Sequence, residues 1–292
     1  MRTVFTSFVL AFSTLFGWTQ EMTETPMANS LLWKIEGPGI KKGCYLFGTM
    51  HLIEKDKFYF PDKLKKLVEK SDVLVMELPG LPNQLEAMQY VTLKEGSFFD
   101  YFSPEQEDSL FAWAKKEMNM SPEKFRSTVE KMKPFVVVQM ATQMHFIGKT
   151  ESYEMKLDNL ARANELEIAG LETVAEQMAI FDQLSAEQQT TMVMEGIRDI
   201  EKGLALTERM QQVYRSQNID SLYLMIAEDG GVISEEQSDF LDDRNLKWIP
   251  KIVAFCQKNK TFIAVGAGHL GGPNGVIRLL RKEGFTVTPV EL

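Results

Sequence analysis

The stretch CYLFGTMH, residues 44–51, decides how this chain is expected to fold. It is an apolar run that enters a glycine, and His51 follows three residues after that glycine. The stretch TFIAVGAGH, residues 261–269, repeats the design and ends in His269. A short apolar run that ends at glycine is typical of a strand buried on both faces of a sheet. Because glycine lets the backbone turn sharply, we expect each histidine at the carboxyl edge of the sheet, where α/β proteins bind ligands.

Two glutamates have the same placement relative to apolar runs. Glu77 closes the run at residues 72–76, and Glu172 lies just past the run at residues 165–171. If all four runs are parallel strands, their ends meet at one edge of the sheet. The predicted site then contains two imidazoles and two carboxylates, from His51, Glu77, Glu172 and His269.

The rest of the chain predicts an α/β fold with one mixed, largely parallel sheet flanked by helices. Residues 31–36 are typical of a strand, and the Gly-Pro-Gly turn after them predicts a hairpin with the strand that leads to the first histidine. A helix begun at Pro61 leads to the strand before Glu77, which predicts a right-handed crossover and a parallel pair of strands. Mostly helical patterns at residues 81–166 and 173–257 predict two long helical insertions between strands.

The first residues differ in composition from the rest. Met1-Arg2-Thr3 carries one basic side chain, and the apolar run Val4–Phe16 follows, a pattern typical of a secretory signal peptide. The run is shorter than the roughly 20 apolar residues that a spanning helix needs. We therefore expect a signal peptide at residues 1–20, one domain at residues 21–292, and export to the periplasm or secretion. An uncleaved membrane anchor is the alternative.

The charge of the chain limits its partners. The 292 residues carry a formal net charge of -9, and no run is rich in lysine and arginine. Nucleic acids and anionic lipids are bound by clustered positive charge, so neither is an expected partner. We expect a peptide or small-molecule substrate and no membrane association beyond the export signal. The oligomeric state stays open.

Cys44 and Cys256 are the only two cysteines. Export would permit a disulfide between them. However, Cys44 lies in a predicted buried strand and Cys256 on an apolar helix face, which favours two unpaired thiols. Two thiols alone cannot form a structural zinc site.

The predicted site suits a divalent metal ion. We expect His51, His269 and Glu77 as ligands, because neutral imidazole and carboxylate together bind Zn, Mn or Co. Such an ion lowers the pKa of bound water and polarises a carbonyl group. A glutamate that is not a ligand could act as general base. In the alternative interpretation the glutamates cap loops or the helices that follow, and the histidines pack against the glycine turns.

A second motif overlaps the first. Gly266, Gly268 and Gly271 have the spacing of the dinucleotide-binding fingerprint, and Glu291 lies near the position of its ribose-binding acid. A nucleotide-binding half needs further strands after this motif, and no sequence remains to form them. The fingerprint is therefore not expected to bind a nucleotide. The chain also lacks the G-x-S-x-G motif of serine hydrolases and the H-E-x-x-H motif of zincins.

Several short motifs occur in an order that resembles a known family. They are Gly48-Thr49-Met50-His51, Met76-Glu77-Leu78-Pro79, Gly170-Leu171-Glu172-Thr173 with Glu176-Gln177, Arg244-Asn245 and Gly266-Ala267-Gly268-His269. Over residues 31–290 they resemble the TraB/GumN family, which is related to the Tiki proteases that act on Wnt. The resemblance implies an erythromycin esterase/ChaN-like fold and, for the Tiki branch, metal-dependent proteolysis with Mn or Co.

The resemblance also implies roles for individual residues. His51, His269 and Glu77 become metal ligands, and Glu77, Glu172 and Arg244 become catalytic residues. Arg244 could bind a substrate carboxylate or stabilise an oxyanion, because its guanidinium is a planar fork of donors. Alternatively, Arg244 pairs with a neighbouring aspartate, Asp242 or Asp243. Since fold does not fix function, a non-catalytic protein that binds a ligand or haem, or that regulates a partner, is the alternative to an exported metal-dependent peptidase.

Overall fold

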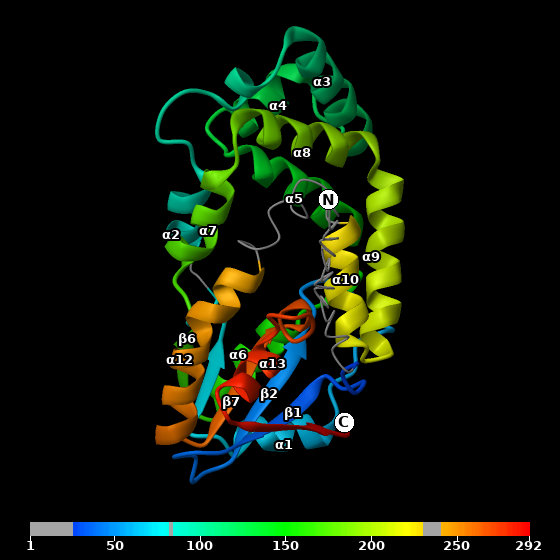
Figure 1. Ribbon diagram of the computed structural model, residues 1–292. Helices are drawn as coiled ribbons and strands as arrows, with labels where there is room; N and C mark the ends of the chain where they lie inside the picture. Colours follow the sequence, from blue (N-terminus) through cyan, green and yellow to red (C-terminus); the bar gives the residue numbers. More distant parts are fainter. Residues whose placement is uncertain (1–25, 82–83, 230–240) are drawn as a thin grey trace, which may run out of the picture.

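The computed structural model describes residues 26–81, 84–229 and 241–292, so the predicted signal peptide lies outside the described residues. Its centre is a six-stranded mixed sheet with the order β6-β4-β7-β2-β1-β8 (Figure 1). The strands are β1 (Leu32–Glu36), β2 (Cys44–Thr49), β4 (Val73–Met76), β6 (Glu167–Gly170), β7 (Thr261–Gly266) and β8 (Thr286–Val290). The four strands β2, β4, β6 and β7 are mutually parallel, and β1 is antiparallel to both β2 and β8. The predicted α/β class and the predicted hairpin are confirmed.

The connection from β2 to the next parallel strand along the chain, β4, passes over one strand of the sheet. Helix α1 (Asp62–Glu69) does connect β2 to β4, and Pro61 stands directly before it. However, β7 lies between these two strands, and its Thr261 pairs with Cys44 on one side and Val73 on the other. The two strands are parallel, as predicted, but they pair with β7 and not with each other. The strand that fills the gap comes from a point almost two hundred residues later in the chain.

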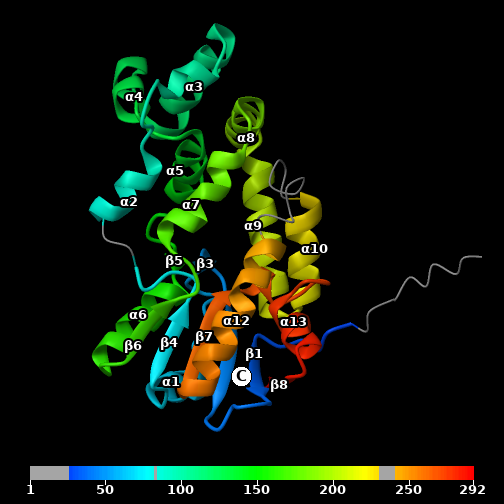
Figure 2. The ribbon, with the colours of Figure 1, turned by 60° about the vertical axis from the view of Figure 1, so that its left-hand side comes forward.

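Helices cover both faces of the sheet, which explains why its parallel strands are apolar throughout. Helices α1 and α6 (Tyr153–Ala163) pack together, and α12 (Asp243–Lys258) packs against α13 (Val276–Lys282) and β7 (Figure 2). The core between them includes Trp33, Phe47 and Phe262, all buried. None of the described helices is long and apolar enough to cross a membrane.

Most of the two predicted insertions forms a helical lobe beside the carboxyl edge of the sheet (Figure 1), whereas α6 and α12, which also fall within them, cover the sheet itself. The first contains α2 (Gln84–Val91), η1 (Phe98–Tyr101), α3 (Pro104–Met118), α4 (Pro122–Val129), α5 (Pro134–Phe146) and β5 (Thr150–Glu151). The second contains α7 (Val174–Gln183), α8 (Ala186–Arg198), α9 (Ile200–Arg215) and α10 (Ile219–Asp229). Both insertions contribute to one core, in which Phe98 and Phe125 from the first pack with Val193 from the second.

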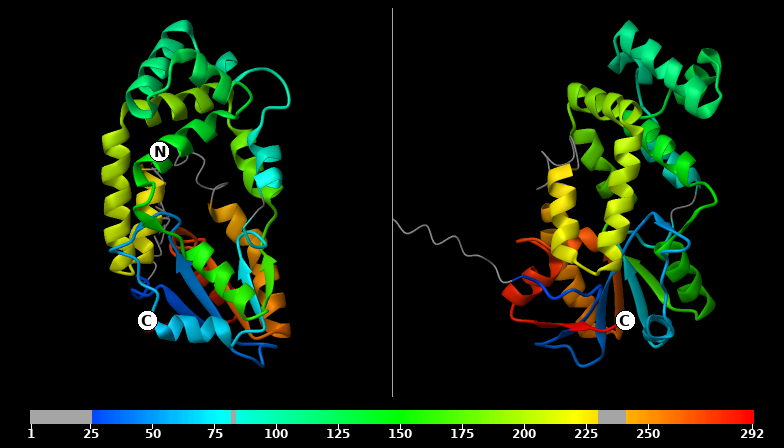
Figure 3. Two further views of the ribbon diagram at one scale, coloured as in Figure 1. Left: turned by 180° about the vertical axis from the view of Figure 1, so that it is seen from behind. Right: turned by 90° about the vertical axis from the view of Figure 1, so that its right-hand side faces the viewer.

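A two-stranded ribbon lies where the lobe meets the sheet. Strand β3 (Ile53–Glu54), which follows His51, pairs antiparallel with β5. Figure 3 shows this ribbon from two further sides, between the sheet and the helices α5 and α9. The ribbon therefore connects the first histidine turn to the helical lobe.

The two cysteines form a disulfide, which corrects the expectation of unpaired thiols. Cys44 on β2 and Cys256 on α12 are both buried, with their Cα atoms 5.6 Å apart. That separation lies in the usual range for a disulfide. The prediction failed because it treated burial as an obstacle, whereas strand and helix bury these side chains in the same layer of the core.

Candidate functional site

The four predicted site residues all follow parallel strands at the carboxyl edge of the sheet. Glu77 comes directly after β4, and Glu172 comes two residues after β6. The N–H of Glu172 donates to the carbonyl of Glu77 (2.9 Å), so the two glutamates lie side by side. His51 follows β2, and His269 ends the short helix η3 (Ala267–His269) after β7.

Arg244, near the start of α12, contacts three of these side chains, Glu77, Glu172 and His269. Its Nε donates to Glu172 Oε2 (3.1 Å), and its Nη2 donates to Glu172 Oε1 (2.6 Å) and to Glu77 Oε2 (2.6 Å). The same guanidinium lies 4.8 Å from the centre of the Trp248 ring, a favourable cation–π distance. Only 12% of the Arg244 side chain is exposed. Because the partners are Glu77 and Glu172, the expected pairing with a neighbouring aspartate, Asp242 or Asp243, is not the contact that holds this side chain.

Glu77 is buried and ionised. Burial by itself would raise its pKa, but the nearby His269, Arg244 and His51, with the N–H of Gly266, lower the pKa to about 2. Of these, the permanent charge of Arg244 and the Gly266 N–H, which donates to Oε1 (2.8 Å), act at every pH. Glu77 therefore carries a full negative charge at neutral pH.

Glu172 is not a helix cap. The cap of α7 is Thr173, whose side chain accepts from the backbone of Glu176, while Glu176 reaches back to Thr173. Glu172 is thus left to accept from Arg244, from Gln177 Nε2 (3.0 Å) and from Trp248 Nε1 (3.3 Å). The helix-capping alternative for this residue is excluded.

The hydrogen bonds of Asn245 fix the protonation of His269. Asn245 Nδ2 lies near the carbonyls of Asn274 (2.9 Å) and His269 (3.4 Å), so its Oδ1 faces the His269 ring. Nδ1 of His269 then carries the proton and donates to Asn245 Oδ1 (2.7 Å). The lone pair at Nε2 is left to accept from Arg244 Nη1 (3.2 Å), and Nε2 lies 3.9 Å from Glu77 Oε1. Burial lowers the pKa of His269 to about 3, so the ring is neutral.

His51 has the opposite environment. Its Nδ1 lies 3.0 Å from Glu154 Oε1, and 68% of its side chain is exposed. Glu154 is held in turn by the hydroxyls of Thr49 (2.7 Å) and Ser152 (3.0 Å). The hydrogen bond that His51 Nδ1 donates to the Glu154 carboxylate raises the pKa of His51 to about 9. His51 is therefore an imidazolium at neutral pH, and Glu154 orients it through Nδ1.

A cavity of about 260 Å³ opens onto this edge of the sheet. Its lining includes His51, Glu154, Glu77 and Gln177. Gln177 donates from Nε2 to both Glu77 (3.2 Å) and Glu172 (3.0 Å). A molecule in the cavity would meet His51, Glu77 and Gln177 directly, whereas Glu172 lies behind Gln177, which donates to it.

The glycines of the two histidine turns serve packing. A Cβ atom on Gly48 would lie 2.8 Å from a methyl carbon of Leu270, so this glycine allows the two turns to approach each other. A Cβ on Gly271 would lie 2.3 Å from the backbone oxygen of Ile219 on α10. Helix α13 begins only at Val276, so the glycine sequence does not open directly into a helix that could hold a phosphate.

Three contributors were not among the predicted site residues. Glu154, Asn245 and Gln177 orient His51, His269 and the glutamates through hydrogen bonds. Asn245 and Gln177 stood inside the motifs that carry the family resemblance, next to Arg244 and Glu176, and that position was their only signal. Glu154 had none, because β5 and α6 bring it to the site from the first insertion.

The donor atoms are compatible with a divalent cation but are not assembled as a metal site. Among residues 26–81, 84–229 and 241–292, no group of three or more His, Cys, Asp or Glu side chains could hold a metal ion. Both histidines engage a protein acceptor through Nδ1, the arrangement that orients metal-binding imidazoles.

Comparison with known proteins assigns the family. No curated protein and no solved structure matches the chain. A family model does match, described as the TraB/PrgY/gumN family, and it covers residues 31–289. That span contains every strand of the sheet except the last residue of β8, and every residue of the site. The chain therefore belongs to the TraB/PrgY/gumN family.

Proposed function

We propose that this protein is an exported metal-dependent hydrolase, and that its substrate is a peptide. The observation that carries the proposal is the way the two imidazoles are held. Each has Nδ1 engaged by a fixed acceptor, Glu154 or Asn245, and Nε2 is the nitrogen left to serve as ligand. Glu77, ionised and 3.9 Å from Nε2 of His269, is the third ligand.

The chemistry of these donors suits Mn, Co or Zn. Two imidazoles and one carboxylate form a mixed nitrogen and oxygen set, which these ions accept. His51 would bind as the neutral ring and so release a proton, and His269 would exchange its contact with Arg244 for the ion. When bound, the ion would polarise the scissile carbonyl and acidify a water molecule.

The protein residues have separable roles in this proposal. In place of the ligand role, Glu77 could serve as general base and accept a proton from water, because it faces the cavity and is ionised at neutral pH. Arg244 is a preorganised donor that can stabilise negative charge on a carbonyl oxygen. Glu172 acts as a positioning residue, because both of its oxygens hold the Arg244 fork.

The second candidate is a binding or regulatory protein without turnover, with haem among its possible ligands. One observation favours it: Arg244 already supplies a cation to both glutamates, and the network is closed without a metal. A ligand would then occupy the cavity beside His51 and leave the Glu77 and Glu172 network intact.

Metal analysis of the purified protein tests the proposal. One equivalent of Mn, Co or Zn is expected after dialysis, and both His51→Ala and His269→Ala should lose it. The third histidine provides a matched control, because His145 lies on α5 outside this site and His145→Ala should keep the metal. Hydrolysis of a broad peptide panel by the metal-loaded protein should disappear in the same two variants. Metal retention in both variants would contradict the site, and stoichiometric metal without hydrolysis would favour the second candidate.

A further inference from the structure

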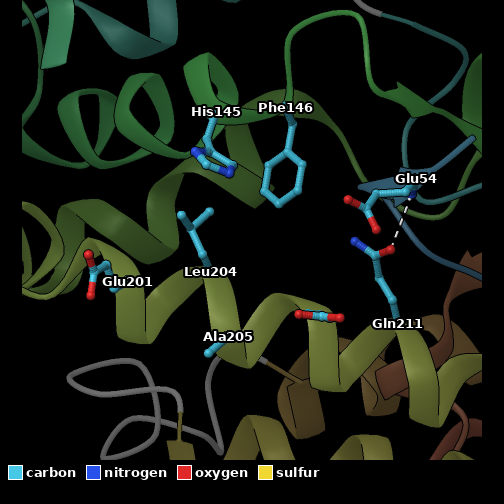
Figure 4. Close-up of a pocket in the computed structure, with 8 residues that line it drawn as sticks. Glu54, His145, Phe146, Glu201, Leu204, Ala205 and Gln211 are labelled. Carbon is cyan, nitrogen blue, oxygen red and sulfur yellow. Dashed lines mark hydrogen bonds between the residues drawn. The ribbon is translucent and has the colours of Figure 1, made fainter.

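A second cavity, of about 390 Å³, lies between α5, α9 and the β3 strand (Figure 4). Three carboxylates line it, from Glu54, Glu201 and Glu208, together with the imidazole of His145, and the described residues add no lysine or arginine to the lining. One wall is apolar and includes Phe146 and Leu204. The cavity is therefore acidic on one side and apolar on the other, which suits a small cation with an apolar part.

Gln211 supplies an unsatisfied donor in the same cavity. Its side chain is 1% exposed, and its Oε1 accepts from the backbone N–H of Glu54 (3.2 Å). That bond fixes the orientation of the amide, so Nε2 is a donor, and it has no hydrogen-bond partner. Figure 4 shows the amide directed between Glu54 and the Phe146 side of the cavity. Since a buried donor without a partner is unfavourable, a ligand that accepts a hydrogen bond from Nε2 would remove this penalty.

The carboxylates and the Gln211 donor together indicate a ligand that carries both a positive charge and a hydrogen-bond acceptor. A bare metal ion would satisfy the carboxylates, but it cannot accept a hydrogen bond from Nε2 of Gln211. Glu208 and Gln211 lie three residues apart on α9, so their side chains are neighbours on one helix face. We infer that this cavity binds a primary ammonium group that stands next to a carbonyl-type oxygen. The ammonium group pairs with Glu208, the oxygen accepts from Gln211, and the side chain packs on Phe146 and Leu204.

Two sources have this chemistry, a free amino acid and the amino terminus of a peptide. The carboxylate of a free amino acid adds negative charge to a cavity with three glutamates, so the uncharged carbonyl of a peptide fits better. Lys57 forms an ion pair with Glu54 and also attracts Glu208 at longer range. Glu208 has no ion pair of its own among the described residues, so it is the principal partner for the ammonium group. Glu54 is three residues from His51, so their Cα atoms lie within about 11 Å of each other. A role in holding a peptide substrate rests on the proposed function, whereas the binding site itself does not.

Calorimetry on the full protein, stripped of metal with EDTA, tests the inference without turnover. The probes are Leu-Gly-Gly, its Nα-acetyl derivative, free leucine and Mn²⁺ alone. We expect Leu-Gly-Gly to bind and its acetylated form to lose binding. Glu208→Gln should weaken binding about tenfold, the value of one charged hydrogen bond. The exposed Glu187 on α8 is the matched control, and Glu187→Gln should leave the affinity unchanged.

Each outcome separates the possibilities. Tighter binding of Leu-Gly-Gly assigns a peptide terminus, and tighter binding of leucine assigns a free amino acid. Gln211→Met, checked for a normal thermal transition, should weaken both ligands. Equal binding of the acetylated peptide, or an unchanged affinity in Glu208→Gln, would overturn the inference. So would Mn²⁺ binding that is lost in Glu208→Gln, since the cavity would then be a metal site. None of these results depends on hydrolysis at the sheet edge.

Discussion

The two histidine turns have nearly the same local sequence design and opposite electrostatics. Both follow neighbouring parallel strands, β2 and β7, and both begin at a glycine. His51 is 68% exposed, bound to a carboxylate and charged, while His269 is buried, bound to an amide and neutral. The charge of His51 comes from Glu154 on α6, and the neutrality of His269 comes from its burial, while Asn245 on α12 fixes its tautomer. A local motif positions a side chain, and its tertiary neighbours set its charge.

The stability of the fold should depend far more on the partners of the buried turn than on those of the exposed turn. We expect the largest effect on stability from the loss of Arg244. Arg244→Ala leaves Glu77 and Glu172 buried without a cation, which should lower the free energy of unfolding by about 3–5 kcal/mol. Urea unfolding measures this. Arg198, whose side chain is 67% exposed, is the control, and Arg198→Ala should change stability by about 0.5 kcal/mol or less. Equal effects of the two substitutions would show that the Arg244 network is not a stabilising feature of the buried turn.

The disulfide joins the elements that carry the two turns, so its loss is the next largest effect. It links β2, which precedes His51, to α12, which holds Arg244 and Asn245, across 212 residues of sequence. Replacing both cysteines by alanine should cost about 2–4 kcal/mol, because the unfolded chain gains freedom. Urea unfolding with and without reductant measures the change. Reductant should destabilise the original protein and leave the double variant unaffected; a response in both would place the effect elsewhere.

The pH dependence of stability should identify the buried histidine. The pKa of folded His269, about 3, lies below the unfolded value of about 6.5, so unfolding takes up a proton as the pH falls. Its contribution is present above pH 6.5 and is lost toward pH 3, by about 2 kcal/mol between pH 7 and pH 5. Glu77, whose pKa is lowered to about 2, changes the free energy of unfolding only below the unfolded pKa of about 4.3. It therefore does not contribute to the slope between pH 7 and pH 5.

Urea unfolding at several pH values checks this slope. His269→Gln should flatten it between pH 7 and pH 5, and His145→Gln on α5 should not. The same slope in both variants would mean that His269 does not stay neutral in the folded protein.

The exposed turn should give the smallest effect on stability and a clear spectroscopic one. Glu154→Gln removes the charge that holds the pKa of His51 near 9, so this pKa should fall toward 6.5 in an NMR titration. The raised pKa of His51 stabilises the fold fully below pH 6.5, and this stabilisation is lost as the pH rises through 9. In Glu154→Gln the free energy of unfolding should therefore no longer fall between pH 6.5 and pH 9 on account of His51. Glu151→Gln on β5 is the control. An unchanged His51 pKa in Glu154→Gln would show that Glu154 does not set the charge of His51.

The sequence predicted the α/β class and the placement of four side chains at one edge of the sheet, for identifiable reasons. Apolar runs that end at glycine marked β2 and β7, and acidic residues after two further runs marked β4 and β6. It did not predict that β7 lies between β2 and β4, because strand order depends on contacts between residues far apart in the chain. The disulfide was misjudged for the same reason, since Cys44 and Cys256 meet only when α12 packs on the sheet.

By itself, the sequence determined which side chains stand at the carboxyl edge of a parallel sheet, because strand periodicity and glycine turns are local properties. Only the tertiary structure decided which of them are charged. Arg244 reaches Glu77 and Glu172 from a helix that begins more than seventy residues after the later glutamate, and Asn245 beside it fixes the His269 tautomer. Charge in a protein interior depends on burial and on the nearest partners, and both are set by packing rather than by neighbours in sequence.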